Sequence, residues 1–320
     1  MKIVMLEPIA VGENLLKELA APILAKGHVV EFCASPLSAH EKIDKARDAD
    51  VLIVANTPIS AEFVKECANV KMISVAFTGV DHLPKEACAA QKITVCNAQG
   101  YATIAVRDLV FGMVFGLMRN LVSCNDVVRQ GGTKDGLVGN EIDGKVFGIV
   151  GYGQIGQAVA KVAAAFGCNV LAYTRSKAPG TSDGIVKFVE FKDILSNSDI
   201  ISLHTPLTAE TKNMFGAAQF AAMKPTAIFI NAARGPVVDS AALAAALNNE
   251  QIAAAGIDVF DIEPPLNLDE PLLAAKNTLL APHIGFATKE SMVKRAKIVF
   301  ENVEKWLEGS PQNFVFGGVK

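Results

Sequence analysis

The sequence predicts an α/β protein built from two Rossmann-like, doubly wound parallel sheets with a cleft between them. Short apolar strands alternate with helical patterns along nearly the whole chain, which is typical of parallel sheets with right-handed crossovers. A glycine-rich turn stands between a strand and a helix in the middle of the chain. The length of 320 residues fits about two domains.

The first part of the chain, residues 1–98, alternates strands with helices. The expected strands are Ile3–Leu6, Val29–Cys33, Val51–Val54, Met72–Val75 and Ile93–Cys96, and the expected helices are Asn14–Leu24, Glu41–Asp48, Ala61–Ala68 and Lys85–Ala90. This part has no glycine-rich phosphate turn, so we do not expect it to hold a nucleotide. A long helix, about Thr103 to Asn120, follows it, and the last helix, about Lys289 to Leu307, is long enough to pack back on it.

The middle of the chain has the order of elements that a dinucleotide site needs. The apolar run Lys145–Val150 leads into Gly151-Tyr152-Gly153-Gln154-Ile155-Gly156, and a helical stretch follows. The first glycine makes a tight turn, the second lets the backbone approach a pyrophosphate, and the third lets helix and strand pack closely. The helix N-terminus then faces the phosphates. A glycine-rich turn that serves packing alone is the alternative. Further strands are expected at 169–173, 186–188, 200–204, 227–231, 254–258 and 278–281.

The residues after the second strand of this domain bear on the choice of cofactor. NAD-specific sites usually place a carboxylate here, on the ribose 2′-hydroxyl. This chain has Thr174-Arg175-Ser176-Lys177 instead. Arg175 and Ser176 could bind a 2′-phosphate through charge-assisted hydrogen bonds, whereas a carboxylate would repel it. The sequence therefore favours NADP(H), and a solvated basic loop that accepts NAD as well is the alternative.

Composition and charge argue against nucleic-acid-binding, membrane, secreted and metal-binding proteins. A formal net charge of −3 gives no reason to expect nucleic acid or an anionic membrane as a partner. No apolar stretch approaches the roughly 18 residues of a membrane span. Residues 1–6 run straight into Glu7-Pro8, which indicates a strand rather than a signal peptide, so we expect a cytoplasmic protein. The six cysteines show no CxxC spacing and are interpreted as reduced core residues, so no metal is expected.

Three ionisable residues, Arg234, Glu263 and His283, each follow an expected strand of the nucleotide domain. Ligands bind outside the carboxyl ends of the strands in an open α/β sheet. An arginine can hold the carboxylate of an α-keto acid and polarise its carbonyl, and a histidine can exchange the proton on the C2 oxygen. A carboxylate beside the histidine orients it and favours its protonated form, while a nicotinamide transfers hydride at C2. Spacing alone does not prove that the three converge, and each alone could be a loop salt-bridge residue.

Several segments carry motifs that belong together. They are Val150–Gly156, Leu203–Thr208 with Thr211, Ile230–Asp239, Asp258–Phe260 with Glu263-Pro264, and Pro282–Gly285 with Ala287-Thr288. With these motifs the chain resembles the D-isomer-specific 2-hydroxyacid dehydrogenases over nearly its whole length. In that family the arginine, glutamate and histidine of the motifs are catalytic, and they match Arg234, Glu263 and His283.

The resemblance also implies an organisation and further site residues. It implies a discontinuous, flavodoxin-like substrate domain of residues 1–98 and 289–320, and a nucleotide domain of residues 99–288 that forms a homodimer through its first helix. Backbone amides at Thr78 and Gly79 match the family's substrate-carboxylate site. The side-chain end of the substrate pocket matches Asn56, Phe77 and Tyr101. The glycine turn and residues 174–176 match cofactor-binding positions of the family. Further cofactor-binding positions match His204, Pro206, Thr211, Ala232 and Asp258. The family residue that matches Asp258 holds the nicotinamide carboxamide.

The expected function is NAD(P)H-dependent reduction of a small 2-keto acid to the D-2-hydroxy acid, with His283 as the acid–base. The stretch Val95–Tyr101 resembles glycerate dehydrogenases, which reduce hydroxypyruvate or glyoxylate. One alternative is a nucleotide-sensing corepressor or scaffold of the same fold, although such members carry extended tails that we do not find in the sequence. The other is a formate-dehydrogenase-like oxidase, which normally has glutamine where Glu263 stands.

Overall fold

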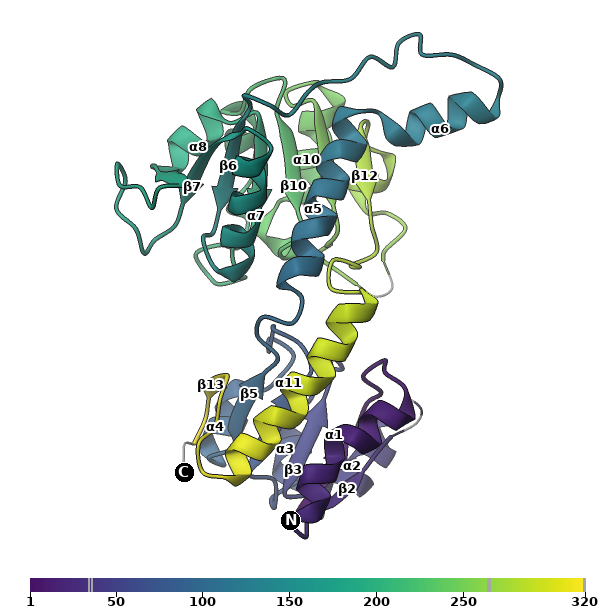
Figure 1. Cartoon of the computed structure of the whole chain (residues 1–320), viewed down its shortest axis with the longest axis vertical. Coiled ribbons are helices and arrows are strands. Elements are labelled where there is room, and N and C mark those ends of the chain that lie inside the picture. Colours follow the sequence, from purple (N-terminus) through teal and green to yellow (C-terminus); the bar gives the residue numbers. More distant parts are fainter. Residues whose placement is uncertain (34, 36, 264–265, 319–320) are drawn as a thin grey trace. The chain divides into compact units, whose positions relative to one another are not determined.

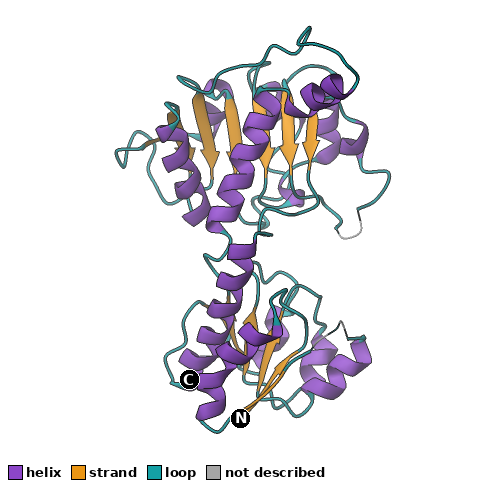
Figure 2. Ribbon diagram, turned by 45° about the vertical axis from the view of Figure 1, so that its right-hand side comes forward, coloured by secondary structure: helices purple, strands orange, loops and turns teal. Residues whose placement is uncertain are grey.

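The computed structural model divides the chain into two compact α/β units, residues 1–102 with 287–320, and residues 103–286. Figure 1 shows the elements of each unit, and Figure 2 shows helices on both sides of each sheet. The structure describes residues 1–33, 35, 37–263 and 266–318, so Pro264 of the family motif lies outside the described residues. Two α/β units built on parallel sheets confirm the predicted fold class.

The first unit contains a six-stranded sheet in the order β13-β5-β4-β3-β1-β2. Its strands are β1 (Lys2–Met5), β2 (Val29–Glu31), β3 (Val51–Val54), β4 (Met72–Val75), β5 (Thr94–Asn97) and β13 (Phe314–Phe316). The first five are parallel and have the flavodoxin-like order 2-1-3-4-5. β13 pairs antiparallel with β5 and adds an edge strand to those that the sequence predicts.

The helices of the first unit begin at residues suited to capping. They are α1 (Glu13–Ala25), α2 (Ala39–Ala46), α3 (Ala61–Glu66), α4 (Lys85–Ala90) and α11 (Lys289–Leu307). The side chains of Ser38, Ser60 and Thr288 each accept a hydrogen bond from an amide in the first turn of α2, α3 and α11. α11 packs on β4, β5 and α1, and its Trp306 Nε1 donates to Thr94 Oγ1 at 3.1 Å.

The second unit contains a seven-stranded parallel sheet in the order β12-β11-β10-β9-β6-β7-β8. Its strands are β6 (Val146–Val150), β7 (Asn169–Tyr173), β8 (Val186–Phe188), β9 (Ile200–Leu203), β10 (Ile228–Asn231), β11 (Ala254–Ile257) and β12 (Thr278–Leu280). The chain winds one way from β6 to β8 and the other way from β9 to β12. The order therefore reverses between β6 and β9, which is where an open α/β sheet binds its ligand.

The helices of the second unit include one boundary that differs from the prediction. They are α5 (Thr103–Met118), α6 (Leu121–Arg129), α7 (Gln154–Ala165), α8 (Phe191–Asn197), α9 (Ala217–Ala221) and α10 (Ser240–Asn248). The sequence predicts one helix as far as Asn120, but Asn120 has a left-handed φ of 51° that ends α5 and starts α6. Within the described residues, no helix has both the length and the apolar character to cross a membrane.

Candidate active site

The glycine-rich turn joins β6 to α7, and its three glycines have different surroundings. Gly151 has a φ of 98°, and a Cβ there would lie 2.5 Å from the carbonyl oxygen of His204. A Cβ at Gly156 would collide with the carbonyl oxygen of Gly151. At Gly153, which caps α7, no described atom lies within 4 Å of the Cβ position. Packing explains Gly151 and Gly156, whereas the open space at Gly153 and the helix N-terminus suit an approaching phosphate.

The loop after β7 presents a cation and two hydroxyls. The hydroxyls of Thr174 and Ser176 lie 3.3 Å apart. Arg175 is 69% exposed, and its Nη1 lies 4.0 Å from Oε2 of Glu210. An exposed pair of this kind stabilises a protein by under about 1 kcal/mol. Arg175 can therefore leave Glu210 for a more highly charged anion.

The segment after β9 is ordered by its own side chains. The Oγ1 of Thr211 donates to the carbonyl of Pro206 at 2.7 Å and accepts from the amide of Thr208 at 2.7 Å. At the end of β9, Nε2 of His204 lies 2.9 Å from Oγ of Ser202. Burial lowers the pKa of His204 to about 3, so its ring is neutral at working pH. His204 lies beside the glycine-rich turn and therefore adds no charge to it.

Glu263 and His283 come together although they are twenty positions apart in the sequence. The Nδ1 of His283 lies 2.6 Å from Oε1 of Glu263, and Oε2 of Glu263 accepts the amide of Phe260 at 3.2 Å. The carboxylate thus has a fixed orientation and engages Nδ1 of the imidazole. This leaves Nε2 as the ring nitrogen that can exchange a proton with a substrate. His283 also has a φ of 54°, a left-handed conformation that is uncommon outside glycine.

Asp258 anchors the residues that follow His283. It is buried, and its two carboxylate oxygens accept the amides of Ile284 and Gly285, each at 2.8 Å. Burial raises the pKa of Asp258, while the two amides and His283 act in the opposite direction. A Cβ at Gly285 would lie 2.8 Å from Oδ2 of Asp258, so this contact favours glycine. The family resemblance assigns Asp258 to the cofactor, whereas its contact with the histidine loop is found only in the structure.

Arg234 lies in a turn held by a buried amide side chain. The Nδ2 of Asn231 donates to the carbonyl of Arg234 at 3.1 Å, and its Oδ1 accepts the amide of Ala233 at 3.0 Å. Gly235 lies so close to the Phe260 backbone that a Cβ would collide with it. The Arg234 turn, which includes Ala232, therefore packs on the segment whose amide binds Glu263. Asn231 and Gly235 lie within the motif Ile230–Asp239, but the sequence assigns neither of them a role. An Asn two residues before the amide that it binds is a local turn signal that could have indicated the role of Asn231.

The residues assigned to the substrate lie in the first unit, on loops that follow β3, β4 and β5. The carbonyl of Thr78, next to Gly79, accepts Nδ2 of Asn97 at 2.7 Å. The rings of Phe77 and Tyr101 meet edge to face, with centroids 6.2 Å apart and an interplanar angle of 86°. Asn56 is exposed, and both neighbouring amides, of residues 55 and 57, donate to the carboxylate of Glu7 at 3.0 and 3.4 Å.

Comparison with known proteins places the chain in a family. The sequence model of the family described as "D-isomer specific 2-hydroxyacid dehydrogenase, NAD binding domain" matches residues 111–285. The chain belongs to this family. It is 39% identical to a glyoxylate reductase from Thermococcus litoralis over 94% of both proteins, and 35% identical to a hydroxypyruvate reductase from Blautia hydrogenotrophica over 91% of this chain and 92% of that protein. A solved acyclic imino acid reductase (Bsp5) in complex with NADPH and D-Arg matches with a TM-score of 0.89 at 27% identity, covering 99% of this chain and 100% of that one.

Membership confirms the predicted family and the predicted enzyme class, an NAD(P)-dependent oxidoreductase that acts on D-2-hydroxy acids. The relatives named above are reductases, which favours the enzyme over the corepressor alternative. The glutamate at position 263, in contact with His283, distinguishes the site from the glutamine that the formate-dehydrogenase alternative predicts.

The Glu263–His283 contact predicts the effect of a substitution at residue 263. The carboxylate engages Nδ1 of His283 at 2.6 Å, whereas a neutral amide can turn its NH2 group toward the ring and does not hold the ring in the same way. We therefore expect Glu263→Gln to lower kcat for keto-acid reduction in steady-state kinetics, with the affinity for NADPH nearly unchanged. Glu301→Gln, at an exposed position of α11, is the control. An unchanged kcat in Glu263→Gln would mean that another group orients the ring.

Proposed function

We propose that the protein reduces a small 2-keto acid to the D-2-hydroxy acid, with His283 as the acid–base, Arg234 as the ligand of the substrate carboxylate and carbonyl, and NADP(H) as the preferred cofactor. The contact between His283 Nδ1 and Glu263 carries the proposal. It engages one ring nitrogen with a carboxylate and leaves the other for the substrate. A proton donor of this kind is what the oxygen of a keto group needs as it becomes a hydroxyl.

The residues of the cofactor site fit a dinucleotide. The open space at Gly153 and the amides of Gln154 and Ile155 at the start of α7 would hold the diphosphate. Asp258 and the segments around Pro206 and Ala232 would border the nicotinamide side. When bound, NAD(P)H supplies the hydride that adds to C2 of the keto acid.

The protein's own residues then control charge and protons. Arg234 would hold the substrate carboxylate through its planar guanidinium and draw electron density toward the carbonyl oxygen. Nε2 of His283 would donate its proton to that oxygen, and Glu263 would hold the ring in position through Nδ1. In the oxidation direction the neutral ring would take the proton back. Asp258 would keep the histidine loop in position through its two amide contacts.

The substrate is proposed to be small, as in hydroxypyruvate or glyoxylate. The similarity of the chain to a glyoxylate reductase and a hydroxypyruvate reductase supports this size class. Amides at Thr78 and Gly79 would bind the carboxylate, and Asn56, Phe77 and Tyr101 would surround the C2 substituent.

A panel of reactions tests the proposal. The decrease in nicotinamide absorbance would be followed with hydroxypyruvate, glyoxylate and pyruvate, each with NADPH and NADH, and the product would be assigned by chiral chromatography. We expect turnover with at least one keto acid and a D-product. Turnover of formate with NAD⁺, without keto-acid reduction, would support the formate-dehydrogenase alternative instead.

The loop after β7 predicts cofactor preference. We expect kcat/KM for NADPH to exceed that for NADH by about tenfold or more, because one or two charge-assisted bonds to the 2′-phosphate are available. Arg175→Ala should raise KM for NADPH far more than KM for NADH, and the preference should weaken at high salt. Lys192→Ala, which removes an exposed cation elsewhere in the same unit, is the control. Equal or better kinetics with NADH in the unchanged protein would contradict the proposal and leave NAD as the cofactor.

We also propose that the protein forms a homodimer through its nucleotide unit and functions in the cytoplasm. The resemblance assigns the interface to the first helix, but α5 already buries much of its surface within its own unit. α6, which the structure describes in full, has no buried residue, and Val128 and Val138 are 70% and 85% exposed. Figure 1 shows α6 and the following loop extending from their sheet. We therefore place the interface on α6, and light scattering should report twice the chain mass of 33.8 kDa.

A further inference from the structure

Arg295, on α11, is a buried cation in the first unit. It is 3% exposed, and its Nη2 donates to the carbonyl of Ile9 at 2.8 Å. Its guanidinium carbon lies 4.9 Å from the ring centroid of Phe77 and 5.8 Å from that of Tyr101. These three partners lie on the loops that follow β1, β4 and β5. One side chain thus joins three loops at the carboxyl edge of the sheet.

Stability alone is a poor explanation for this arginine. Burial of a guanidinium is costly, and it lowers the pKa of Arg295, while Tyr101 acts in the opposite direction. A methionine could fill a similar volume without that cost, and such replacements of buried charges are often neutral or stabilising. A methionine, however, cannot make directional hydrogen bonds or cation–π contacts. The planar cation attracts the faces of aromatic rings and donates hydrogen bonds in fixed directions.

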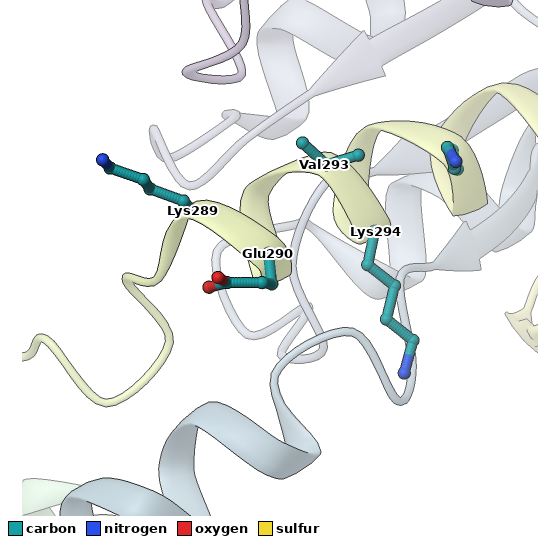
Figure 3. A pocket seen from close by; sticks show the side chains of 5 residues that line it. Lys289, Glu290, Val293 and Lys294 are labelled. Atoms are coloured by element: carbon teal, nitrogen blue, oxygen red, sulfur yellow. The ribbon is translucent and has the colours of Figure 1, made fainter.

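The other side of α11 offers no comparable arrangement. Lys289, Glu290, Val293, Lys294 and Lys297 line a shallow hollow on the exposed side of the helix, where Figure 3 shows the labelled charged side chains projecting away from the backbone. These residues belong to one helix, and all are exposed. The hollow has the character of a solvated helix face, apart from Lys294, whose Nζ donates to the carbonyl of Gly100 at 3.0 Å. Lys297 is therefore the suitable control for Arg295.

We propose that Arg295 is a positioning residue that fixes the rings of Phe77 and Tyr101 as the wall of the side-chain end of the keto-acid pocket. This inference rests on the proposed function. A substrate with a hydroxymethyl group on C2, such as hydroxypyruvate, uses that wall. Glyoxylate, with only hydrogen in that place, does not. Arg295 therefore acts on the choice between substrates rather than on the chemical step.

The test compares these two substrates in one variant. With saturating NADPH, Arg295→Met should raise KM for hydroxypyruvate about tenfold, which corresponds to about 1.4 kcal/mol. KM for glyoxylate and the dissociation constant of NADPH should change by less than about twofold. Arg295→Lys, which keeps the cation but not its planar shape, should give an intermediate loss. Lys297→Met makes the same change of charge on the same helix and should leave both substrates unaffected.

Several outcomes would overturn the inference. An equal loss with both substrates would mean that Arg295 supports the whole loop that carries Thr78 and Gly79. No change with either substrate would mean that its role is packing. If Arg295→Met does not fold, Phe77→Leu removes one ring from the same cluster and should give the same selective loss. Wild-type protein without keto-acid reduction would overturn the proposed function itself, whereas an active wild type with an unselective Arg295→Met overturns only this inference.

Discussion

Replacement of His283 by alanine is expected to lower kcat for keto-acid reduction by about 10²–10⁴-fold, the usual loss when a general acid–base is removed. The physical reason is the contact between Nδ1 and Glu263, which orients the ring and leaves Nε2 as the nitrogen that would donate the proton. Without the ring, water would have to supply the proton without a fixed position. Steady-state kinetics with saturating hydroxypyruvate or glyoxylate measures the effect.

Cofactor binding separates a catalytic loss from a structural one. The affinity for NADPH, measured by its fluorescence on binding, should be nearly unchanged in His283→Ala. His40→Ala is the matched control, because His40 is exposed on α2 in the first unit. The left-handed backbone at His283 permits alanine only with some strain, so the thermal midpoint of the variant should be measured as well. Turnover within a few-fold of wild type would remove His283 from the mechanism.

Most strand positions could be predicted because the central strands are buried on both faces of their sheets. Strands such as Val51–Val54 and Met72–Val75 are continuous apolar runs, and each is fully buried in the structure. β13 has no such signal, because it is short and Phe314 and Val315 are exposed. The end of α5 was not predicted because no proline or glycine marks it. Asn120 adopts the left-handed conformation there instead.

The sequence points to the ionisable groups of the candidate site but not to the residues that hold them. Arg234, Glu263 and His283 stand out because each is an ionisable residue after a strand. The groups that hold them act across loops distant in sequence: Asp258 binds the amide of Ile284, and Gly235 packs on the backbone of Phe260. Such contacts form because the loops follow strands that are neighbours in the sheet, as β11 and β12 are. The spacing of residues along the chain does not give the distance between two loops.

Arg234→Lys should lower kcat/KM for the keto acid by about 10²–10³-fold, the range found when one donor to a developing oxyanion is lost. A guanidinium offers two parallel hydrogen bonds to a carboxylate and can also reach the carbonyl, whereas a lysine is a point charge on a flexible stem. Because the same group would both bind and polarise the substrate, KM should rise and kcat should fall together. Initial rates over a range of keto-acid concentrations, at saturating NADPH, resolve the two parameters.

The structure explains why lysine would not adapt at this position. Asn231 holds the carbonyl of residue 234, and Gly235 is pressed against Phe260, so the turn cannot shift to bring a shorter donor set to the same place. Arg175→Ala is the complementary variant, because its loss should appear in KM for NADPH rather than for the keto acid. A loss in Arg234→Lys confined to cofactor affinity would place Arg234 in the nucleotide site. The acid–base pair of His283 and Glu263 would then need another cation to hold the substrate carboxylate.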